Sequence, residues 1–265
     1  MTRFGFVLVI LSIWCLVRIG SAYDPETAVG IWLFDDGQGD VAHDSSGAEN
    51  HGTLVGDADW VNEGKFGGAV LLDGEGDFVD CGNDPGLELH DSSVSFVMWI
   101  YPNEKKDARI IWKNNGTPCP YRGVYGATWQ SGQLGMFPDG SINFGFGDGE
   151  TCARPFSAFP GVKQWIHVAA VRDRAAKKVY QYVNGEVTVV DDKTEDVAFD
   201  SNLFIGARPD TAAHFHGMID DVGVFKSALT ESDVERIMTH GLDAGAAVFP
   251  SGKLAGVWGR IKAGP

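Results

Sequence analysis

Short apolar runs, separated by glycine, aspartate, asparagine and proline, recur along most of the chain. Within them apolar and polar positions tend to alternate, which is typical of strands. An Asn-Gly pair within residues 183–186 indicates a tight hairpin turn, and residues 138–141 carry an Asp-Gly pair of the same kind. The predicted strands are 28–34, 51–56, 68–73, 77–82, 93–102, 108–114, 125–130, 133–138, 141–147, 165–173, 178–192, 201–208 and 217–225. Many strands with tight turns and no intervening helix predict an all-β, two-sheet antiparallel jelly-roll sandwich.

One segment near the C-terminus has helical periodicity instead. Thr230 is placed as the N-cap and Gly241 as the stop. Between them, the first turn contains the acidic residues Glu231 and Asp233. Val234, Ile237 and Met238 then form an apolar stripe. The sequence therefore predicts one short C-terminal helix.

The closing strand, 217–225, contains two adjacent carboxylates among apolar residues. Strict alternation places Asp220 on the same face as Val222 and Val224, and Asp221 on the opposite face. Both faces then contain apolar residues, so the strand is predicted to be buried on both sides. Burying a carboxylate without a partner costs on the order of several kcal/mol, and a cation or hydrogen-bond donors must offset this cost.

The first 22 residues have the pattern of a cleavable signal peptide. Arg3 precedes an apolar run over residues 4–17, and the small residues Gly20, Ser21 and Ala22 follow. A retained membrane anchor is the alternative, although the run is shorter than the roughly 20 residues that a span needs. The interpretation divides the chain into a signal peptide (1–22), one domain (23–243) and a C-terminal tail without an assigned role (244–265). The protein is accordingly expected to be secreted or held in the cell envelope, with no membrane insertion after cleavage.

The chain is strongly acidic. Its formal net charge is −15 over 265 residues, and loss of residues 1–22, which contain two arginines and no acid, would change it to −17. Such a surface argues against nucleic acids and anionic lipids as partners, and it suits an exported protein that meets calcium.

The cysteines suggest at most one disulfide bond. Cys119 and Cys152 lie in loop-like sequence and could be bonded in an oxidising compartment, or could remain separate. Cys81, at the end of a predicted strand, is expected to be a buried free thiol. No Cys/His spacing indicates zinc.

Several segments, in order along the chain, resemble the laminin G-like jelly roll of the concanavalin A-like lectin/glucanase superfamily. The resemblance covers roughly residues 28–241 and rests on five stretches rather than one motif. These are GIWLFDDGQGDVAHDSSGAENHGTL, GKFGGAVLLDGEGDFVDCG, SVSFVMWIYP, WIHVAAVRDRAAKKVYQYVNGE and GMIDDVGVFKSALTESDVERI.

The resemblance implies a structural calcium ion that joins the first strand, the loop containing Asp44 and the last strand. Calcium takes about six to eight oxygen ligands. The implied side-chain ligands are Asp44 and Asp220, with Asn50 and the Thr53 carbonyl nearby and with Asp77 and Asp221 as further candidates. Two other interpretations stay open. Asp44 could cap the amides of the following turn, and Asp220 could accept hydrogen bonds from amides of the first strand.

The sequence does not predict an enzyme. Glucanases of the superfamily place two glutamates and an aspartate on one strand as E-x-D-x-x-E, and this chain has no such run. Sugar recognition instead needs aromatic rings beside polar groups, and the segment between residues 101 and 146 is rich in both. The candidate ligand-binding residues are Asn115, Tyr121, Arg122, Tyr125 and Trp129.

The sequence thus predicts an exported, non-catalytic recognition module for a glycan or an extracellular protein surface. The alternatives are a structural or adhesive protein without a small-ligand site and a divergent glycoside hydrolase. Fold alone does not decide among them.

Overall fold

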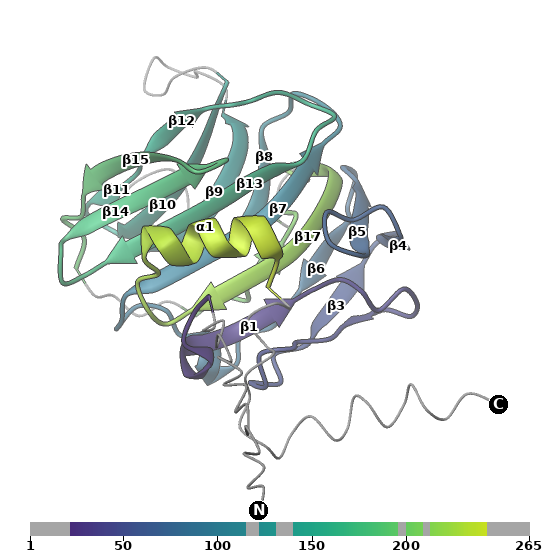
Figure 1. The fold of residues 1–265 in the computed structure, drawn as a ribbon, viewed down its shortest axis with the longest axis horizontal. Coiled ribbons are helices and arrows are strands. Elements are labelled where there is room, and N and C mark those ends of the chain that lie inside the picture. The colour runs from purple at the N-terminus through teal and green to yellow at the C-terminus, as the bar shows by residue number, and fades with distance from the viewer. Residues whose placement is uncertain (1–21, 115–121, 131–139, 196–199, 209–212, 243–265) are drawn as a thin grey trace, which may run out of the picture.

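The computed structural model describes residues 22–114, 122–130, 140–195, 200–208 and 213–242. Two antiparallel sheets face each other in a jelly-roll sandwich with a single helix among these residues, which confirms the predicted fold class (Figure 1). Within this part of the chain, no helix has the length and apolar character that crossing a membrane requires.

One sheet, which we call the front sheet because it lies nearer the viewer in Figure 1, has eight strands. Their order is β15-β14-β13-β7-β17-β5-β4, with β1 paired to β17. Its strands are β1 Ala28–Trp32, β4 Asp59–Val61, β5 Ala69–Asp73, β7 Val94–Pro102, β13 Ile166–Asp173, β14 Lys178–Val183, β15 Glu186–Asp191 and β17 His216–Phe225. The first and last strands of the described fold, β1 and β17, are therefore neighbours in this sheet.

The back sheet has nine strands in the order β11-β10-β9-β8-β16-β6-β3-β2, with β12 paired to β10. Its strands are β2 Val41–Ala42, β3 Gly52–Val55, β6 Phe78–Asp80, β8 Ala108–Asn114, β9 Arg122–Gln130, β10 Ser141–Asp148, β11 Cys152–Ala153, β12 Phe156–Ala158 and β16 Phe204–Ile205. The 3-10 turns Pro25–Thr27 and Pro85–Leu87 complete the described elements besides the helix.

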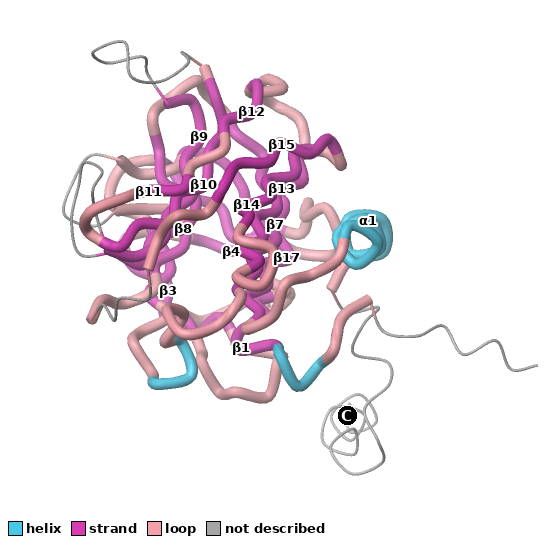
Figure 2. Tube along the Cα trace, turned by 90° about the vertical axis from the view of Figure 1, so that its left-hand side faces the viewer, coloured by secondary structure: helices cyan, strands magenta, loops and turns pink. Residues whose placement is uncertain are grey.

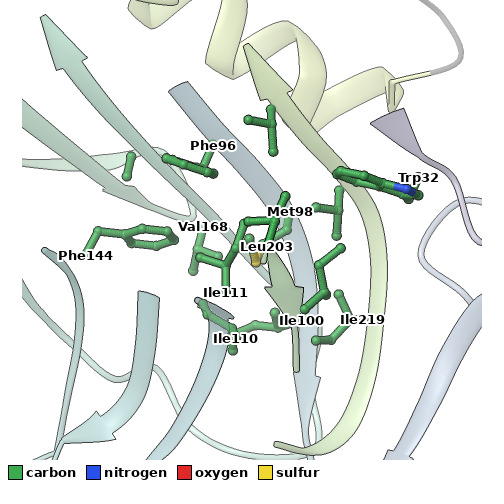
Figure 3. Close-up of a cluster of buried hydrophobic side chains, with 14 of the residues drawn as sticks. Trp32, Phe96, Met98, Ile100, Ile110, Ile111, Phe144, Val168, Leu203 and Ile219 are labelled. Carbon is green, nitrogen blue, oxygen red and sulfur yellow. The ribbon is translucent and has the colours of Figure 1, made fainter. Parts of the chain in front are cut away.

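The hydrophobic core fills the space between the two sheets (Figure 3). The Phe96 ring of the front sheet stacks near the Phe144 ring of the back sheet, with centroids 6.5 Å apart. At one edge Gln181, fully buried on β14, accepts a hydrogen bond from the Phe144 amide and donates to the Ile142 carbonyl. A satisfied amide at this position ties the two sheets together without the cost of an unpaired polar group.

The helix α1, Glu231–His240, lies across the outer surface of the front sheet (Figures 1 and 2). The Thr230 hydroxyl accepts the Asp233 amide and the Asp233 carboxylate accepts the Thr230 amide, so both helix-end donors are satisfied. Val234 and Ile237 pack onto Phe225 and its neighbours in a second apolar cluster. The predicted helix, with its N-cap and its Gly241 stop, is confirmed.

The Asn184-Gly185 turn is also confirmed. Both residues have positive φ (49° and 86°), which suits the tight turn between β14 and β15. Of the predicted Asp-Gly turn, residues 138 and 139 lie outside the described residues, as does the predicted strand 133–138.

The predicted alternation of β17 is wrong at its centre. The pairing of β17 with β7 shifts register between Asp220 and Gly223, and Asp221 has a φ of +46°. This extra residue is a β-bulge, so the face on which each side chain lies changes at that point. Ile219 and Val222 both point into the core between the sheets, and Asp220 lies on the opposite face.

Candidate functional site

A row of aromatic and polar side chains crosses the outer surface of the back sheet. Strand pairing places Phe204 of β16 between Trp112 of β8 and Asp80 of β6. Directly opposed residues on neighbouring strands share a face. Trp112 and Phe204 form a cluster separate from the core, whereas their chain neighbours Ile111 and Ile205 lie inside it. The row therefore faces away from the sandwich interior.

The row combines ring, cationic and amide groups at short range. The Arg208 guanidinium lies 4.8 Å from the centre of the Trp112 ring, and Trp112 is only 4% exposed. Trp112 thus does not offer an open stacking face. Phe78, two residues before Asp80, meets the half-buried Phe204 edge to face at 5.6 Å.

The polar end of the row is held in a fixed orientation. The Asn202 amide donates to both carboxylate oxygens of Asp80, at 3.0 and 3.1 Å, and the Gly82 amide donates to Asp80 Oδ1 at 2.9 Å. We refer to Phe78, Asp80, Trp112, Asn202, Phe204 and Arg208 as the aromatic row. Apolar rings with a few oriented polar groups are the usual lining of ligand sites.

The predicted ligand-binding residues lie beside this row or outside the described residues. Asn115 and Tyr121 lie outside. Arg122, Tyr125 and Trp129 belong to β9, whose backbone places Tyr125 opposite Trp112. The ligand-binding role of these five residues stays a prediction.

Sequence reasoning missed most of the aromatic row. Its members come from three separate segments, and only the strand order β8-β16-β6 brings them together.

Among the described residues, the aromatic row contains one carboxylate, Asp80, and not the closely spaced pair of a retaining glycosidase. The strand neighbours of Asp80 are Phe204 and Thr53, and the next residues on its own face are Phe78 and Gly82. A retaining enzyme needs two carboxyl groups about 5 Å apart. Asp80 therefore has no acidic neighbour in these positions to act with.

Asp44 behaves as a turn cap. Its Oδ1 accepts the amides of Ile31 and Ser46, both at 2.8 Å, and its Oδ2 accepts the Ser46 hydroxyl and the Asn50 amide. The Asn50 side chain in turn donates to the Val29 carbonyl at 2.6 Å. These contacts tie the 44–50 turn to β1, so the capping alternative fits the structure.

The structure does not bring Asp44 and Asp220 to one site. Asp44 bridges to Trp32 of β1, and Trp32 pairs with Val222 on its other side, so strand β1 lies between Asp44 and β17. Neighbouring strands are about 4.8 Å apart, so the separation is roughly two strand spacings. Thr53 lies in β3 of the back sheet.

Asp221 bonds to yet another segment, because its Oδ2 accepts the amide of Leu242 at 2.8 Å. The six predicted calcium ligands are thus distributed over several places.

Asp77 is the one predicted ligand that lies among other carboxylates. Ligand oxygens of Asp57, Asp73 and Asp77 lie within 4.8 Å of one another, the only such group of acidic, histidine or cysteine side chains in the described ranges. Asp77 is buried and accepts the amides of Asp57 (3.0 Å) and Asp73 (2.8 Å), whereas Asp57 and Asp73 are exposed. Three converging carboxylates are oxygen ligands of the kind that calcium prefers.

A second polar row, unanticipated from the sequence, crosses the outer face of the front sheet. Strand pairing places Trp99 of β7 between Asp220 of β17 and His167 of β13. The Trp99 and His167 rings are 5.1 Å apart, and the Lys65 ammonium lies 4.3 Å from the centre of a Trp99 ring. Asp220 Oδ2 accepts the amide of Phe66 at 2.8 Å, so the loop containing Lys65 and Phe66 covers the row.

Burial sets the charge of this second row. Desolvation, with a smaller contribution from Asp221, raises the pKa of Asp220 to about 8, although the Phe66 amide acts against it. Desolvation, with the nearby Lys65 charge, lowers the pKa of His167 to about 3. Both side chains are therefore mainly neutral near pH 7. The alternative interpretation of Asp220, a carboxylate that accepts an amide hydrogen bond, is right about the type of bond. It is wrong about the donor, which is the Phe66 amide and not an amide of the first strand.

The cysteine predictions are tested in part. Cys81 is a buried free thiol, as expected, and burial raises its pKa well above the usual value. Cys152 lies in the two-residue strand β11 rather than in a loop. Cys119 lies outside the described residues, so a bond between the two stays a prediction.

Comparison with solved structures shows the same fold in several binding domains. The binding domain of Paraclostridial Mosquitocidal Protein 1 matches with a TM-score of 0.63 and 13% identity, over 81% of this chain and 52% of that one. The botulinum neurotoxin serotype D ligand-binding domain in complex with N-acetylneuraminic acid matches with a TM-score of 0.61 and 15% identity, over 81% and 51%. This chain thus spans about half the length of these toxin domains.

A shorter relative matches almost end to end. Domain 4 of AbnA, a GH43 extracellular arabinanase from Geobacillus stearothermophilus, in complex with arabinotriose, has a TM-score of 0.58 and 19% identity, over 83% of this chain and 98% of that one. At these identities the likeness shows the fold alone.

Sequence comparison identifies the family. No curated protein matches the chain significantly. The model of the concanavalin A-like lectin/glucanases superfamily, however, matches residues 73–235, more than half of the chain. This stretch runs from the end of β5 through the closing strand β17 into α1. The chain therefore belongs to the concanavalin A-like lectin/glucanases superfamily.

Proposed function

We propose that the protein is an exported, non-catalytic module that binds a glycan through the aromatic row of its back sheet. The observation that carries this proposal is the half-buried Phe204 ring, placed by strand register beside Asp80, whose carboxylate is oriented by the Asn202 amide. Rings pack against the apolar faces of a sugar, while an oriented amide and carboxylate bond its hydroxyls. Binding domains among its structural relatives, one of them in complex with arabinotriose, support the same class of function.

An extracellular protein surface is the second candidate ligand, and a structural or adhesive protein without a small-ligand site is the alternative. Export rests on the signal-like residues 1–22. Just after the predicted cleavage point, Tyr23 is buried and its hydroxyl donates to the Leu242 carbonyl. Mass spectrometry of the exported chain, expected to begin at Tyr23, tests this part.

The binding proposal predicts that Phe204→Leu and Asn202→Ala each weaken glycan binding at least about tenfold, or roughly 1.4 kcal/mol. Leucine keeps apolar volume but removes the ring, and alanine removes the donor to Asp80. The measurement is isothermal titration of the mature chain with arabinotriose first, then with the best neutral oligosaccharide from a glycan array. Unfolding midpoints of each variant are recorded in parallel.

Val187→Ala is the matched control, because Val187 is an exposed apolar residue on β15 of the front sheet. Unchanged affinity in both back-sheet variants would move the site elsewhere. No binding across the array would favour the structural or adhesive alternative.

We also propose a structural calcium ion, held by Asp77 together with Asp57 and Asp73. We expect millimolar calcium, compared with EDTA, to raise the unfolding midpoint of the wild type by several degrees. A ligand at about 100 times its Kd stabilises by about 2.7 kcal/mol, and each kcal/mol is worth roughly 2–4 °C at this size.

Asp57→Asn should lose that response, since it removes one ligand charge and leaves the amide bonds to Asp77 intact. Asp91→Asn, at an exposed aspartate elsewhere, should keep it. A midpoint that ignores calcium in the wild type would refute the calcium proposal.

A further inference from the structure

A cavity of about 420 Å³ opens at one end of the front sheet, away from the aromatic row. It lies where the end of β13, the turn into β14 and the chain after β15 come together, because Lys178 at the start of β14 pairs with Asp191 at the end of β15. Its volume is within the range of small-ligand pockets, about 300–1,000 Å³. Its basic lining residues are Arg172, Arg174, Lys177 and Lys193.

The floor of the cavity is a satisfied buried ion pair. Arg172 Nε donates to Asp192 Oδ2 at 2.6 Å, and both side chains are almost fully buried. Arg172 also donates to the Thr194 hydroxyl at 2.7 Å, and that hydroxyl donates to Asp192 Oδ1 at 2.5 Å. These charges offset each other, so the floor is rigid and close to neutral.

The rim carries the excess positive charge. Beside the paired Asp192, Glu195 is the one other carboxylate among the lining residues, which also include Arg174, Lys177 and Lys193. The two lysine ammonium groups are exposed and form no hydrogen bond or ion pair with other described residues. This cationic rim belongs to a chain whose net charge is −15. Local concentration of one sign of charge around a cleft attracts ligands of the other sign.

We infer that this cavity binds an anionic ligand, the carboxylate of an acidic saccharide unit, between the two exposed lysines and Arg174. The saccharide part of this inference rests on the proposed glycan-binding function; the anionic part rests on the cavity alone. Arg174 keeps a contact to the His90 carbonyl at 3.4 Å, which holds its guanidinium at the rim. The site is separate from the aromatic row, so it would read a charge that the row does not.

Two lysines form a matched pair for the test. Lys177 and Lys163 are both exposed and both have positive φ, 53° and 56°. They lie beyond opposite ends of the eight-residue strand β13, which spans about 27 Å at roughly 3.4 Å per residue. Asparagine tolerates this backbone conformation, so Lys177→Asn and Lys163→Asn remove the same charge with the same strain.

The experiment is titration of the mature chain with D-glucuronate, D-glucose and sodium sulfate, followed by NMR chemical shifts or calorimetry. We expect glucuronate to bind at least tenfold more tightly than glucose, and Lys177→Asn with Lys193→Gln to weaken it at least tenfold. Lys163→Asn should leave glucuronate affinity unchanged. Raising the ionic strength from about 0.01 M to about 1 M should weaken binding in the wild type, because salt screens exposed charges.

Three results would overturn the inference. Glucuronate could fail to bind, it could bind the double variant as tightly as the wild type, or sulfate could bind as tightly as glucuronate and so show no saccharide selectivity. None of these touches the proposed function, which is tested with neutral oligosaccharides and back-sheet variants. Conversely, back-sheet variants that lose neutral glycan binding but still bind glucuronate would support a separate anion site.

Discussion

Replacing Asp220 with asparagine is expected to remove most of the loss of stability that the wild type shows between about pH 6.5 and about pH 8. Asp220 is fully buried, and its Oδ1 has no hydrogen-bond partner among the described residues. Burial raises its pKa from 3.8 to about 8. Asparagine keeps an acceptor for the Phe66 amide but carries no charge to desolvate.

The direction of the effect follows from proton linkage. Between pH 3.8 and about pH 8 the folded state holds a proton on Asp220 that the unfolded state has released. Stability therefore falls as pH rises through this window. Each pKa unit corresponds to about 1.36 kcal/mol, so the full effect is on the order of a few kcal/mol.

His167 contributes the opposite slope. Its pKa is lowered from 6.5 to about 3, so the unfolded state binds the extra proton between these values and stability falls as pH decreases. From about pH 4 to 6.5 the two slopes offset each other. Above pH 6.5, of these two contributions only that of Asp220 remains.

The measurement is urea unfolding of wild type and Asp220→Asn at steps from pH 5 to pH 9. The difference between the two curves isolates Asp220 from all other titrating groups. Asp91→Asn, at an exposed position, controls for the loss of a carboxylate. Parallel curves for wild type and Asp220→Asn above pH 6.5 would mean that Asp220 is already ionised in the folded protein.

Replacing Arg172 with methionine is expected to lower the free energy of unfolding by about 3–5 kcal/mol. The reason is that Asp192, only 8% exposed, would be left buried without the guanidinium that lies 2.6 Å away. The Thr194 hydroxyl and carbonyl would also lose the Arg172 donor. Urea unfolding at neutral pH measures the change.

The double variant Arg172→Met, Asp192→Leu distinguishes the cost of an unpaired buried charge from the loss of the ion pair itself. Replacing both charges by apolar groups is often neutral or stabilising, so most of the loss should be recovered. A single variant that costs less than about 1 kcal/mol would place the pair with ordinary surface salt bridges. Failure of the double variant to recover stability would instead assign the loss to packing.

Local features of the fold could be predicted from the sequence because neighbours along the chain determine them. The Thr230 cap, the Val234 and Ile237 stripe and the Gly241 stop belong to one helix, and the Asn184-Gly185 turn to one hairpin. The same holds for the long apolar strands such as β7. The all-β sandwich followed from the number of such strands and from the ordered family segments.

The sequence also identified aspartates with special environments, but not their surroundings. Asp220 is buried as predicted, yet on the other face of β17, because Asp221 adopts a left-handed conformation that no alternation pattern contains. Asp44 was singled out from its turn, and only the pairing of that turn with β1 shows that four donors satisfy it.

The sequence by itself determined the long strands, the helix, the Asn184-Gly185 turn and the acidic character of this protein. The strands, the helix and the turn each depend on residues a few positions apart. Only the tertiary structure decided the aromatic row, the Asp220–Trp99–His167 row and the cationic cavity. In each of these, side chains from distant segments become neighbours through strand order and register. Those are set by the packing of whole sheets across the core, and a one-residue bulge is enough to change which side chains meet.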